Sequence, residues 1–460
     1  MAAKPTRSGA APRPSLGPKV VVVGAGVTGA AIAQALAGRG ALVTVLDAAP
    51  GIGGGCSYAN AALLAPSHVG PLSTPSALGD AMRQMFRRPS AVRVHPQPAL
   101  VPWLSTLGAS ALSRRVQAAV GDMAQMAERS FALHEGLYAA GLSPTFARIG
   151  SVDVYLQRAR HTPAVGDSAA GSRAGAGSAS ASDGPGAETG GLLNATAMRR
   201  LEPALGAVAA GSYHPDEAVT ESRSFVGSML ESARQHGAEV IFECSAVGVV
   251  VEGSRVVGVR TTEGLIEADH VVIASGLGAP RLAGDMGVRL PMRGGRGYVV
   301  DLERSAGAPT HAVRLKEHRV VVTPLADRVR VAGYMEFGSE GAPVDPRRSR
   351  QLVAVASRAL PGLAGLPWLD SWVGERPCLP DGVPALGESG VVAGLHLAVG
   401  HGMWGLILAP ATGVMIADSV LGGDGTHPIP AAFDPDRFSG AGPRSWWLRS
   451  AGKRSVDLPV

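Results

Sequence analysis

The sequence has few cysteines, few aromatic residues and no long apolar run, and each shortage excludes a class of protein. Its three cysteines, Cys56, Cys244 and Cys378, lie far apart with no pair at metal-ligand spacing, which fits a reducing compartment and predicts no metal site. The most apolar stretch near the C-terminus, residues 406–420, is too short to span a bilayer. Residues 1–18 lack the apolar run of a secretory signal. We therefore expect a cytoplasmic protein.

The charge balance is only mildly basic. Lys and Arg number 42 against 37 Asp and Glu, a formal net charge of +5, and no dense basic stripe is interleaved with the aromatic residues, which make up 4% of the chain. That pattern argues against a nucleic-acid partner and suits anionic small molecules or an anionic membrane surface. With 46% apolar and 17% charged residues, the chain of 460 residues is globular and long enough for two or three domains.

A dinucleotide-binding pattern is present near the N-terminus. Four valines at 20–23 predict a buried strand, a helical pattern runs from Val27 to Ala37, and a second strand, Leu42–Leu46, ends on Asp47. The N-terminus of such a helix offers free N–H groups to phosphate, and Asp47 stands about where a carboxylate reaches ribose hydroxyls. The order of strand, turn, helix, strand and acid therefore predicts a bound dinucleotide.

The turn between that strand and helix holds three glycines with separate roles. Gly24 permits the tight turn out of the strand, and Gly26 lets the backbone approach a pyrophosphate. Gly29 lets the helix pack closely against the sheet. These glycines predict a dinucleotide but do not distinguish FAD from NAD.

The middle of the chain mixes helical and strand patterns around a low-complexity segment. Residues 163–191, rich in Ala, Gly and Ser, predict a disordered surface insertion with no catalytic role. Thr220 is suited to cap a helix that runs to His236. Residues 268–275 predict a second buried parallel strand that ends on Gly276 and resumes the first domain. Further helices are expected at 76–88, 100–112, 120–140 and 347–359, and further strands at 239–242, 247–252, 256–262, 297–302, 319–323 and 328–334.

The C-terminal third carries a second glycine-rich turn. Residues 372–387 contain Gly-Glu-Arg-Pro and Pro-Asp-Gly, a strand follows at Leu395–Val399, and Gly-His-Gly-Met-Trp-Gly at 400–405 leads into a helix that ends at Leu421. The N-terminal dipole of that helix can stabilise negative charge, for instance on a reduced ring system. Arg376 stands in a rigid local frame, and its planar, permanently charged guanidinium suits a carboxylate better than lysine would.

These motifs occur in the same order in a known family. The glycine turn, Ser-Tyr-Ala-Asn-Ala at 57–61, Gly297-Tyr298, the Gly-Glu-Arg-Pro block and the Gly-His-Gly turn resemble those of bacterial FAD-dependent D-amino acid dehydrogenases, relatives of D-amino acid oxidase, glycine oxidase and sarcosine oxidase. The resemblance covers roughly residues 19–423. It implies an α/β fold with a Rossmann-like FAD-binding domain and a second α+β substrate domain of mostly antiparallel sheet, as in D-amino acid oxidase. The FAD-binding domain is expected at 19–90, 215–290 and 373–423, the substrate domain at 91–214 and 291–372, and terminal extensions at 1–18 and 424–460.

The resemblance also implies non-covalent FAD and assigns residues to it. Gly24, Gly26, Val27 and Gly29 would hold the pyrophosphate, and Asp47 the adenosine ribose. The other expected cofactor residues are Ser57, Asn60 and Ala61 on the path to the isoalloxazine, Val247 at the adenine, Gly276 at the middle of the cofactor, and Gly400, Gly402, Met403 and Gly405 at the pyrimidine side of the flavin. A covalent bond through Cys378, of the kind that related sarcosine oxidases form, is not expected because a small thiol in a packed loop is usually inert.

The same resemblance predicts Arg376 and Tyr298 as the catalytic residues. Arg376 falls on the position that clamps the substrate carboxylate in the oxidases of this group. Those oxidases place a tyrosine beside the carboxylate where this chain has Val320, so Tyr298 or Tyr334 substitutes for it, or Arg376 acts alone. A neutral α-amine would deliver hydride from its α-carbon to flavin N5, and the imino acid would hydrolyse to a 2-oxo acid and ammonia. No general base is required, and His401 is expected to be a packed or water-bonded loop residue.

The expected activity is oxidative deamination of a D-amino acid, such as D-alanine, D-proline or D-hydroxyproline, with electrons passed to quinone or another acceptor other than oxygen. Two alternatives remain: an oxidase of glycine or a secondary amine that produces hydrogen peroxide, and a flavin-binding subunit that is active only within a larger complex. Residues 443–460 combine Trp446 and Trp447 with basic side chains. They read either as a frayed terminus or as a peripheral contact with the cytoplasmic face of the inner membrane.

Overall fold

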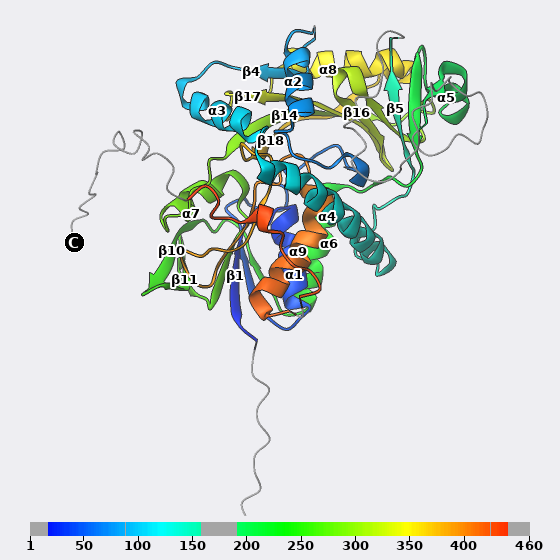
Figure 1. Cartoon of the computed structure of the whole chain (residues 1–460). Helices are drawn as coiled ribbons and strands as arrows, with labels where there is room; N and C mark the ends of the chain where they lie inside the picture. The colour runs from blue at the N-terminus through cyan, green and yellow to red at the C-terminus, as the bar shows by residue number, and fades with distance from the viewer. Residues whose placement is uncertain (1–16, 88, 158–190, 424, 440–460) are drawn as a thin grey trace, which may run out of the picture.

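The computed structural model describes residues 17–87, 89–157, 191–423 and 425–439 (Figure 1). Most of the expected low-complexity insertion at 163–191 and all of the tail at 443–460 lie outside these residues. The described chain forms two units, each with its own sheet, which lie one above the other in Figure 1. The mixed α/β fold class expected from the sequence is confirmed, because one sheet is mainly parallel and the other mainly antiparallel.

The lower sheet is built around the valine strand. β1 (Lys19–Val23) lies between β2 (Leu42–Leu46) and β13 (His270–Ile273), parallel to both, and the valines at 20–23 are buried on both faces as expected of a central parallel strand. The predicted parallel strand at 268–275 is thus confirmed. β9 (Glu239–Ile241) and β20 (Leu395–Val399) extend the parallel part, and β19 (Ala385–Glu388) closes one edge in the antiparallel direction.

Helices cover one face of this sheet. They are α1 (Val27–Ala37), α4 (Arg114–Ala139), α6 (Ser222–Gln235) and α9 (Gly405–Leu421), which gather beside β1 in Figure 1. α1 and α9 pack backbone against backbone: a Cβ on Gly413 would lie 2.6 Å from the carbonyl oxygen of Ala31, so only glycine fits there. α4 was expected in the substrate domain, but Met123 and Met126 of α4 are buried in the core that α1 and α9 share.

A small antiparallel sheet covers the opposite face. It consists of β10 (Ala246–Glu252), β11 (Arg255–Thr261) and β12 (Gly264–Glu267), and α7 (Ala279–Gly284) packs beside it. The side chains of Val21 and Val23, which alternate with those directed at α1, enter this second core. The lower unit therefore has three layers.

The upper sheet assembles strands that are distant in the sequence. Along its path lie β18 (Trp368–Cys378), β14 (Arg293–Glu303), β17 (Arg328–Phe337), β16 (Val320–Pro324), β15 (Ala312–Leu315), β5 (Ser151–Tyr155), β7 (Ala210–His214) and β6 (Leu193–Asn194), and β4 (Val92–Val94) pairs with β17. Most pairs are antiparallel, and β15–β5 and β17–β4 are parallel. α8 (Pro346–Ala359) packs on the far face over the core that contains Leu352 and Val355 (Figure 1).

The remaining helices pack at the upper sheet. α2 (Pro75–Met85) lies beside β4, α5 (Ala195–Leu201) lies beside β6 and β7, and Trp103 of α3 (Val101–Ser110) packs on Phe337 of β17. β3 (Leu63–Leu64) and β8 (Ala218–Val219) form a two-strand ribbon. One local expectation is wrong. Thr220 does not cap α6, because Glu221 precedes the helix and the buried Thr220 hydroxyl bonds those of Thr145 and Ser143. Arg376 lies within the regular strand β18.

Among the described residues, no helix has both the length and the apolar character needed to cross a membrane.

Candidate active site

The predicted cofactor residues converge where the carboxyl ends of β1, β2 and β13 face the upper sheet. Two helix N-termini meet there. A Cβ on Gly405, the first residue of α9, would lie 3.5 Å from a methyl group of Val27, the first residue of α1. Helix N-termini carry unpaired N–H groups and a partial positive charge, so this junction favours an anionic ligand.

The first glycine turn has the geometry that a close backbone approach requires. Gly24 has φ +110°, and a Cβ there would lie 2.7 Å from the carbonyl oxygen of Ala274. A Cβ on Gly29 would lie 1.8 Å from the carbonyl oxygen of Gly24, so α1 cannot approach the turn with any side chain at this position. Gly26 has open space apart from Ser57 Oγ, 3.1 Å from the position of its Cβ. The turn therefore leaves its backbone bare at the start of α1.

Asp47 stands at the end of β2 and holds the turn. Its Oδ2 accepts the N–H of Ala25 at 2.7 Å, and its Oδ1 accepts the N–H of Ala49 at 2.8 Å. A carboxylate has about four acceptor sites, so each oxygen can still accept a hydroxyl hydrogen bond. Asp47 thus both orders the glycine turn and can bind a ribose next to it.

The loop at 57–61 crosses from α1 to the upper sheet. Ser57 Oγ accepts the N–H of Val27 at 3.1 Å, directly at the helix start. Asn60 Oδ1 accepts the N–H of Ala62, and the carbonyl oxygen of Ala61 accepts a hydrogen bond from Thr323 Oγ1 at 2.6 Å. The loop is therefore held by hydrogen bonds at both ends.

Gly276 follows β13 of the lower sheet, and Val247 belongs to the small antiparallel sheet that covers that sheet. Gly276 follows β13 with φ +52°, and nothing lies within 4 Å of the place of a Cβ, so its surroundings are open. Val247, on β10, is more than a third exposed, and its carbonyl oxygen accepts a hydrogen bond from Arg281 Nη1 at 3.3 Å. Both positions can therefore be reached by a ligand that extends from the glycine turn.

The second glycine turn is tight, and its histidine is neutral. Gly400 and Gly402 have φ +80° and +55°, while Met403 is 38% exposed. His401 is buried beside the Thr412 hydroxyl, 3.1 Å from its Nε2, and burial lowers its pKa to about 4. Burial likewise raises the pKa of Cys378 to about 12, against the smaller opposing effect of Arg376, so this thiol is un-ionised at neutral pH.

Arg376 places a guanidinium of the upper sheet at this interface. Its guanidinium lies flat over Gly297, where a Cβ would lie 2.2 Å from Nη2 and 2.3 Å from Nη1. Nη1 donates to the carbonyl oxygen of Tyr334 at 2.9 Å and approaches Met335 Sδ at 3.7 Å. Among the described residues, no Asp or Glu forms an ion pair with Arg376. A positioned, partly buried guanidinium without a carboxylate partner can bind the carboxylate of a ligand.

The phenol side chains of Tyr298 and Tyr334 point away from this guanidinium, although the backbone carbonyl oxygen of Tyr334 contacts it. Tyr298 follows Gly297, so its side chain points to the opposite face, where it is 1% exposed and its hydroxyl donates to Glu336 at 3.3 Å. Tyr334 belongs to the same core, and the Arg348 guanidinium stacks 4.0 Å from its ring centre. In this arrangement neither tyrosine hydroxyl is positioned next to the guanidinium of Arg376.

The surface formed by the glycine turn at 24–29, Asp47, Gly276 and the start of α9, called the cradle below, fits an extended dinucleotide. It combines two helix N-termini with unpaired N–H groups, a carboxylate that can accept further hydrogen bonds, and open space at Gly276. Two buried polar atoms near it, Ser275 Oγ and Trp372 Nε1, have no hydrogen-bond partner among the described residues, as expected of groups that a bound molecule or water completes. The expected FAD therefore matches the residues present.

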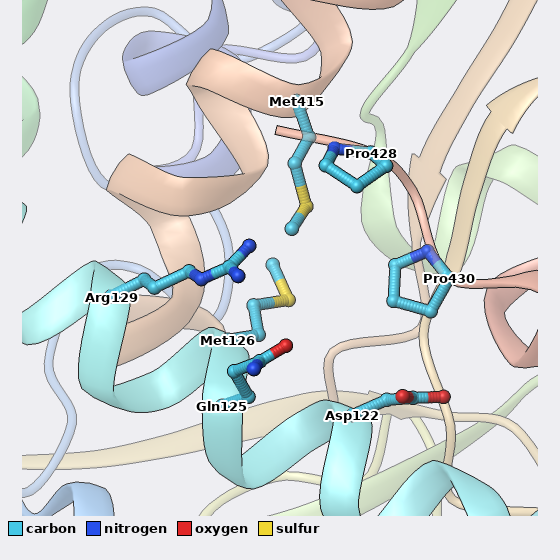
Figure 2. Close-up of a pocket in the computed structure, with 7 residues that line it drawn as sticks. All are labelled: Asp122, Gln125, Met126, Arg129, Met415, Pro428 and Pro430. Atoms are coloured by element: carbon cyan, nitrogen blue, oxygen red, sulfur yellow. The ribbon is translucent and has the colours of Figure 1, made fainter. Parts of the chain in front are cut away.

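A separate cavity of about 220 Å³ lies away from this cradle, between α4, α9 and the segment that follows α9 (Figure 2). Its walls are Asp122, Gln125, Met126, Arg129, Met415, Pro428 and Pro430. None of these is a predicted site residue, and the two methionines at its floor offer no chemistry for oxidation of an amine. It is not part of the active site.

The sequence did not reveal which upper-sheet residues join Arg376. Arg330 donates to the carbonyl oxygen of Asn60 at 3.4 Å and forms a bidentate pair with Asp301. Trp372 packs against Tyr58, with ring centres 4.6 Å apart. The alternating patterns of these strands showed that such residues share a face, but only the register shows which face meets the cofactor loop.

Comparisons with known proteins agree with this geometry. A family model described as FAD dependent oxidoreductase matches residues 19–419. The D-amino acid dehydrogenase of Paramagnetospirillum magneticum is 31% identical over 88% of this chain and 95% of its own length. D-amino acid dehydrogenase 2 of Ralstonia nicotianae is 33% identical over 87% of this chain and 96% of its own length.

Solved structures share the fold. Glycine oxidase from Geobacillus kaustophilus superimposes with a TM-score of 0.66 at 23% identity, covering 92% of this chain and 99% of its own. Iminodiacetate oxidase from Chelativorans sp. gives a TM-score of 0.67 at 22% identity, covering 91% and 99%. The TM-scores establish the likeness of fold.

Proposed function

Because the chain belongs to the FAD dependent oxidoreductase family, and is an enzyme with FAD as its cofactor, we propose that it deaminates D-amino acids oxidatively to 2-oxo acids and ammonia. The observation that carries this proposal is Arg376, a partly buried guanidinium with no carboxylate partner among the described residues, held over a glycine strand that faces the cradle. The names of the similar dehydrogenases from P. magneticum and R. nicotianae support a D-amino acid as the substrate.

The protein contributes orientation and electrostatics. FAD, when bound, supplies the acceptor for the hydride of the substrate α-carbon. Arg376 holds the substrate carboxylate through a bidentate, charge-assisted pair, and Gly297 leaves room for the guanidinium to lie flat. The N-terminus of α9 stabilises negative charge that develops beside it. His401 is neutral and buried against Thr412, so it moves no proton, and the amine is expected to bind deprotonated.

For the electron acceptor we propose a membrane quinone, reached from the cytoplasmic face of the membrane. The surface of α2 supports this: Met82 is 56% exposed, Phe86, which follows the helix, is 81% exposed, and Arg83 lies between them. Apolar and basic side chains together suit the interface of an anionic membrane. Replacing both Met82 and Phe86 by serine should abolish sedimentation with anionic vesicles if this surface makes the contact.

An amino acid oxidase is the second candidate, because glycine oxidase and iminodiacetate oxidase share the fold. The two candidates differ in how the reduced enzyme is reoxidised. A dehydrogenase should be reoxidised rapidly by a soluble quinone analogue and slowly by air, whereas an oxidase should react with oxygen and release hydrogen peroxide.

The proposal is tested by an anaerobic screen of D- and L-amino acids against the FAD-loaded protein, in which loss of the flavin absorbance reports reduction. D-amino acids should bleach the flavin and their L-enantiomers should not. Arg376→Ala should lower kcat/KM about a hundredfold or more while FAD stays bound, because a charge-assisted pair to the substrate is lost. Arg260→Ala, at an exposed position of β11, is the matched control. Loss of FAD from Arg376→Ala would show that this residue has a structural role instead.

A further inference from the structure

A second polar group lies on the same face of the upper sheet as Arg376. Directly paired residues share a face, and the register links Trp372 to Val299, Val299 to Ala332, Ala332 to Val321, and Val321 to Arg314. Trp372 and Arg376 are four residues apart on β18, so they also share that face. Val299 and Ala332 are covered by Ala59 of the cofactor loop, which identifies the face as the one toward the cradle.

The two guanidinium groups stand at opposite ends of a short apolar path. Arg376 lies over Gly297 on β14, and Arg314 belongs to β15, three strands or roughly 14 Å across the sheet and two residues farther along the strands. Val299 and Ala332 are covered by the cofactor loop, whereas Val321, which is paired with Arg314, is only half-buried. The face is therefore least covered next to Arg314.

Five ionisable side chains surround Arg314. Its Nε donates to Asp153 and its Nη1 to Glu217 at 2.7 Å. Lys316 Nζ, His214 Nε2 and His68 Nε2 lie 3.3, 3.5 and 3.6 Å from Asp153 Oδ2. These residues come from β5, β7, β15 and the segments beside them, and from the turn after the cofactor loop.

The two carboxylates of this group are ionised. Burial would raise the pKa of Asp153, but Arg314, His214 and His68 outweigh it and hold the pKa far below its usual range. Burial also acts to raise the pKa of Glu217, and hydrogen bonds from His68 and the charge of Arg314 lower it to about 2. Two anions therefore face two permanent cations, with two imidazoles beside them.

Donors remain in excess after these pairs are made. Arg314 Nη2 is buried and has no hydrogen-bond partner among the described residues, although the side chain is only 9% exposed. Lys316 has three N–H bonds and, among the described residues, a carboxylate contact only with Asp153, and its side chain is 23% exposed. An unpaired buried donor is unfavourable, so the site is complementary to a hydrogen-bond acceptor.

The excess of hydrogen-bond donors in this group also argues against a bound cation. The ligand atoms of His68, Asp153 and His214 lie within 4.8 Å of one another, as they would around a metal ion. However, Lys316 and Arg314 already occupy the carboxylate of Asp153, and a divalent ion would add positive charge beside both. The group is better suited to a negatively charged oxygen.

We propose that the Arg314–Lys316 end of this group binds the side-chain carboxylate of the substrate, so that the preferred substrates are acidic D-amino acids such as D-glutamate. This rests on the proposed function, with Arg376 taking the α-carboxylate. Asp153 and Glu217 position Arg314 and leave Nη2 for the substrate, while Lys316 supplies a second, more mobile donor.

The test compares D-glutamate with D-glutamine, which has the same shape but no charge, in anaerobic reduction of the FAD-loaded enzyme. We expect kcat/KM for D-glutamate to be at least tenfold higher. Lys316→Met should lower that value roughly ten- to hundredfold and change the value for D-glutamine less than twofold. Lys19→Met, at an exposed lysine at the start of β1, is the matched control and should leave the ratio unchanged.

A second variant avoids the loss of a buried charge. Arg314→Ala leaves Asp153 and Glu217 unpaired and would destabilise the fold, so Arg314→Lys, which keeps the charge but removes Nη2, is preferred. It should also lower the D-glutamate to D-glutamine ratio, with the FAD content and melting temperature close to those of the wild type.

The outcomes are distinguishable. If D-alanine bleaches the flavin and D-glutamate is no better than D-glutamine, this inference fails and the proposed function stands. If no D-amino acid bleaches it, both fail. Stoichiometric binding of zinc that is lost in His214→Gln would identify a cation site and overturn the carboxylate assignment.

Discussion

On the cofactor side of the interface, one contiguous stretch from Val20 to Gly29 forms the strand, the turn and the helix start. On the proposed substrate side, Arg376, Gly297 and Arg314 come from three separate strands of the upper sheet. The cofactor side binds through bare backbone, so its requirements are local and sterically strict. The substrate side binds through side chains whose neighbours are set by strand register. The two sides should therefore respond differently to single substitutions.

The largest effect is expected on the cofactor side. Gly29→Val would place side-chain atoms where even a Cβ lies 1.8 Å from the carbonyl oxygen of Gly24, so α1 must move away from the turn. We expect a loss of about 3 kcal/mol or more of folding free energy and loss of FAD. The ratio of flavin to protein after purification measures the second effect, and urea unfolding the first.

Gly51→Ala is the matched control for this substitution. Nothing lies within 4 Å of the place of a Cβ on Gly51, so the added methyl group has space. This variant should keep its FAD and its stability. A Gly29→Val protein that retained stoichiometric FAD would show that the contiguous turn is not as strict as its geometry indicates.

The contrast also explains what the sequence could predict. The parallel strand at 268–275, the glycine turn and the start of α9 were predictable because each is a local pattern with a local cause. The order of the upper sheet was not, since β5 and β7 join β15 only through long-range pairing. Tyr298 or Tyr334 was expected to replace the tyrosine that the oxidases place where this chain has Val320, but the side chain of Tyr298 lies on the sheet face opposite to Gly297 and Arg376. The group around Arg314 gave no sequence signal at all.

Acid should act on the two sides in different pH ranges. Burial lowers the pKa of His401 and of His134 to about 4 in the lower unit, from 6.5. Between pH 6.5 and about pH 4 each of these histidines is protonated in the unfolded chain but not in the folded chain. The free energy of unfolding therefore falls by about 3 kcal/mol for each histidine as the pH is lowered through this range. On the upper sheet, the lowered pKa of Glu217 gives stability that is present above pH 4.5 and is lost as pH falls toward 2.

The cofactor side should therefore weaken first as the pH is lowered. We expect FAD to be released between pH 6.5 and 4, measured by flavin fluorescence, and the contribution of Glu217 to be lost only below pH 4.5. His134→Gln, which cannot take up a proton, should flatten the upper range, and Glu217→Gln should flatten only the lower one. Release of FAD that began only below pH 4 would contradict this order.

The smallest effect is expected from Tyr298→Phe, and it gives the sharpest comparison within the substrate side. Its hydroxyl bonds Glu336 on the α8 face, away from Arg376, so the variant should lose about 1 kcal/mol of stability and keep kcat/KM within twofold. Its neighbour on the strand should behave in the opposite way. Gly297→Ala places a methyl group 2.2 Å from the guanidinium of Arg376, which must move because the backbone cannot.

Gly297→Ala should therefore keep its fold and FAD but raise KM at least tenfold, because the carboxylate clamp is displaced rather than removed. Tyr298→Phe and Gly297→Ala thus differ by one position and one sheet face, and each serves as the control for the other. If Tyr298→Phe impaired turnover while Gly297→Ala did not, the substrate would have to lie on the α8 side of the sheet. That position would separate it from both glycine turns, and no single cofactor could then reach it.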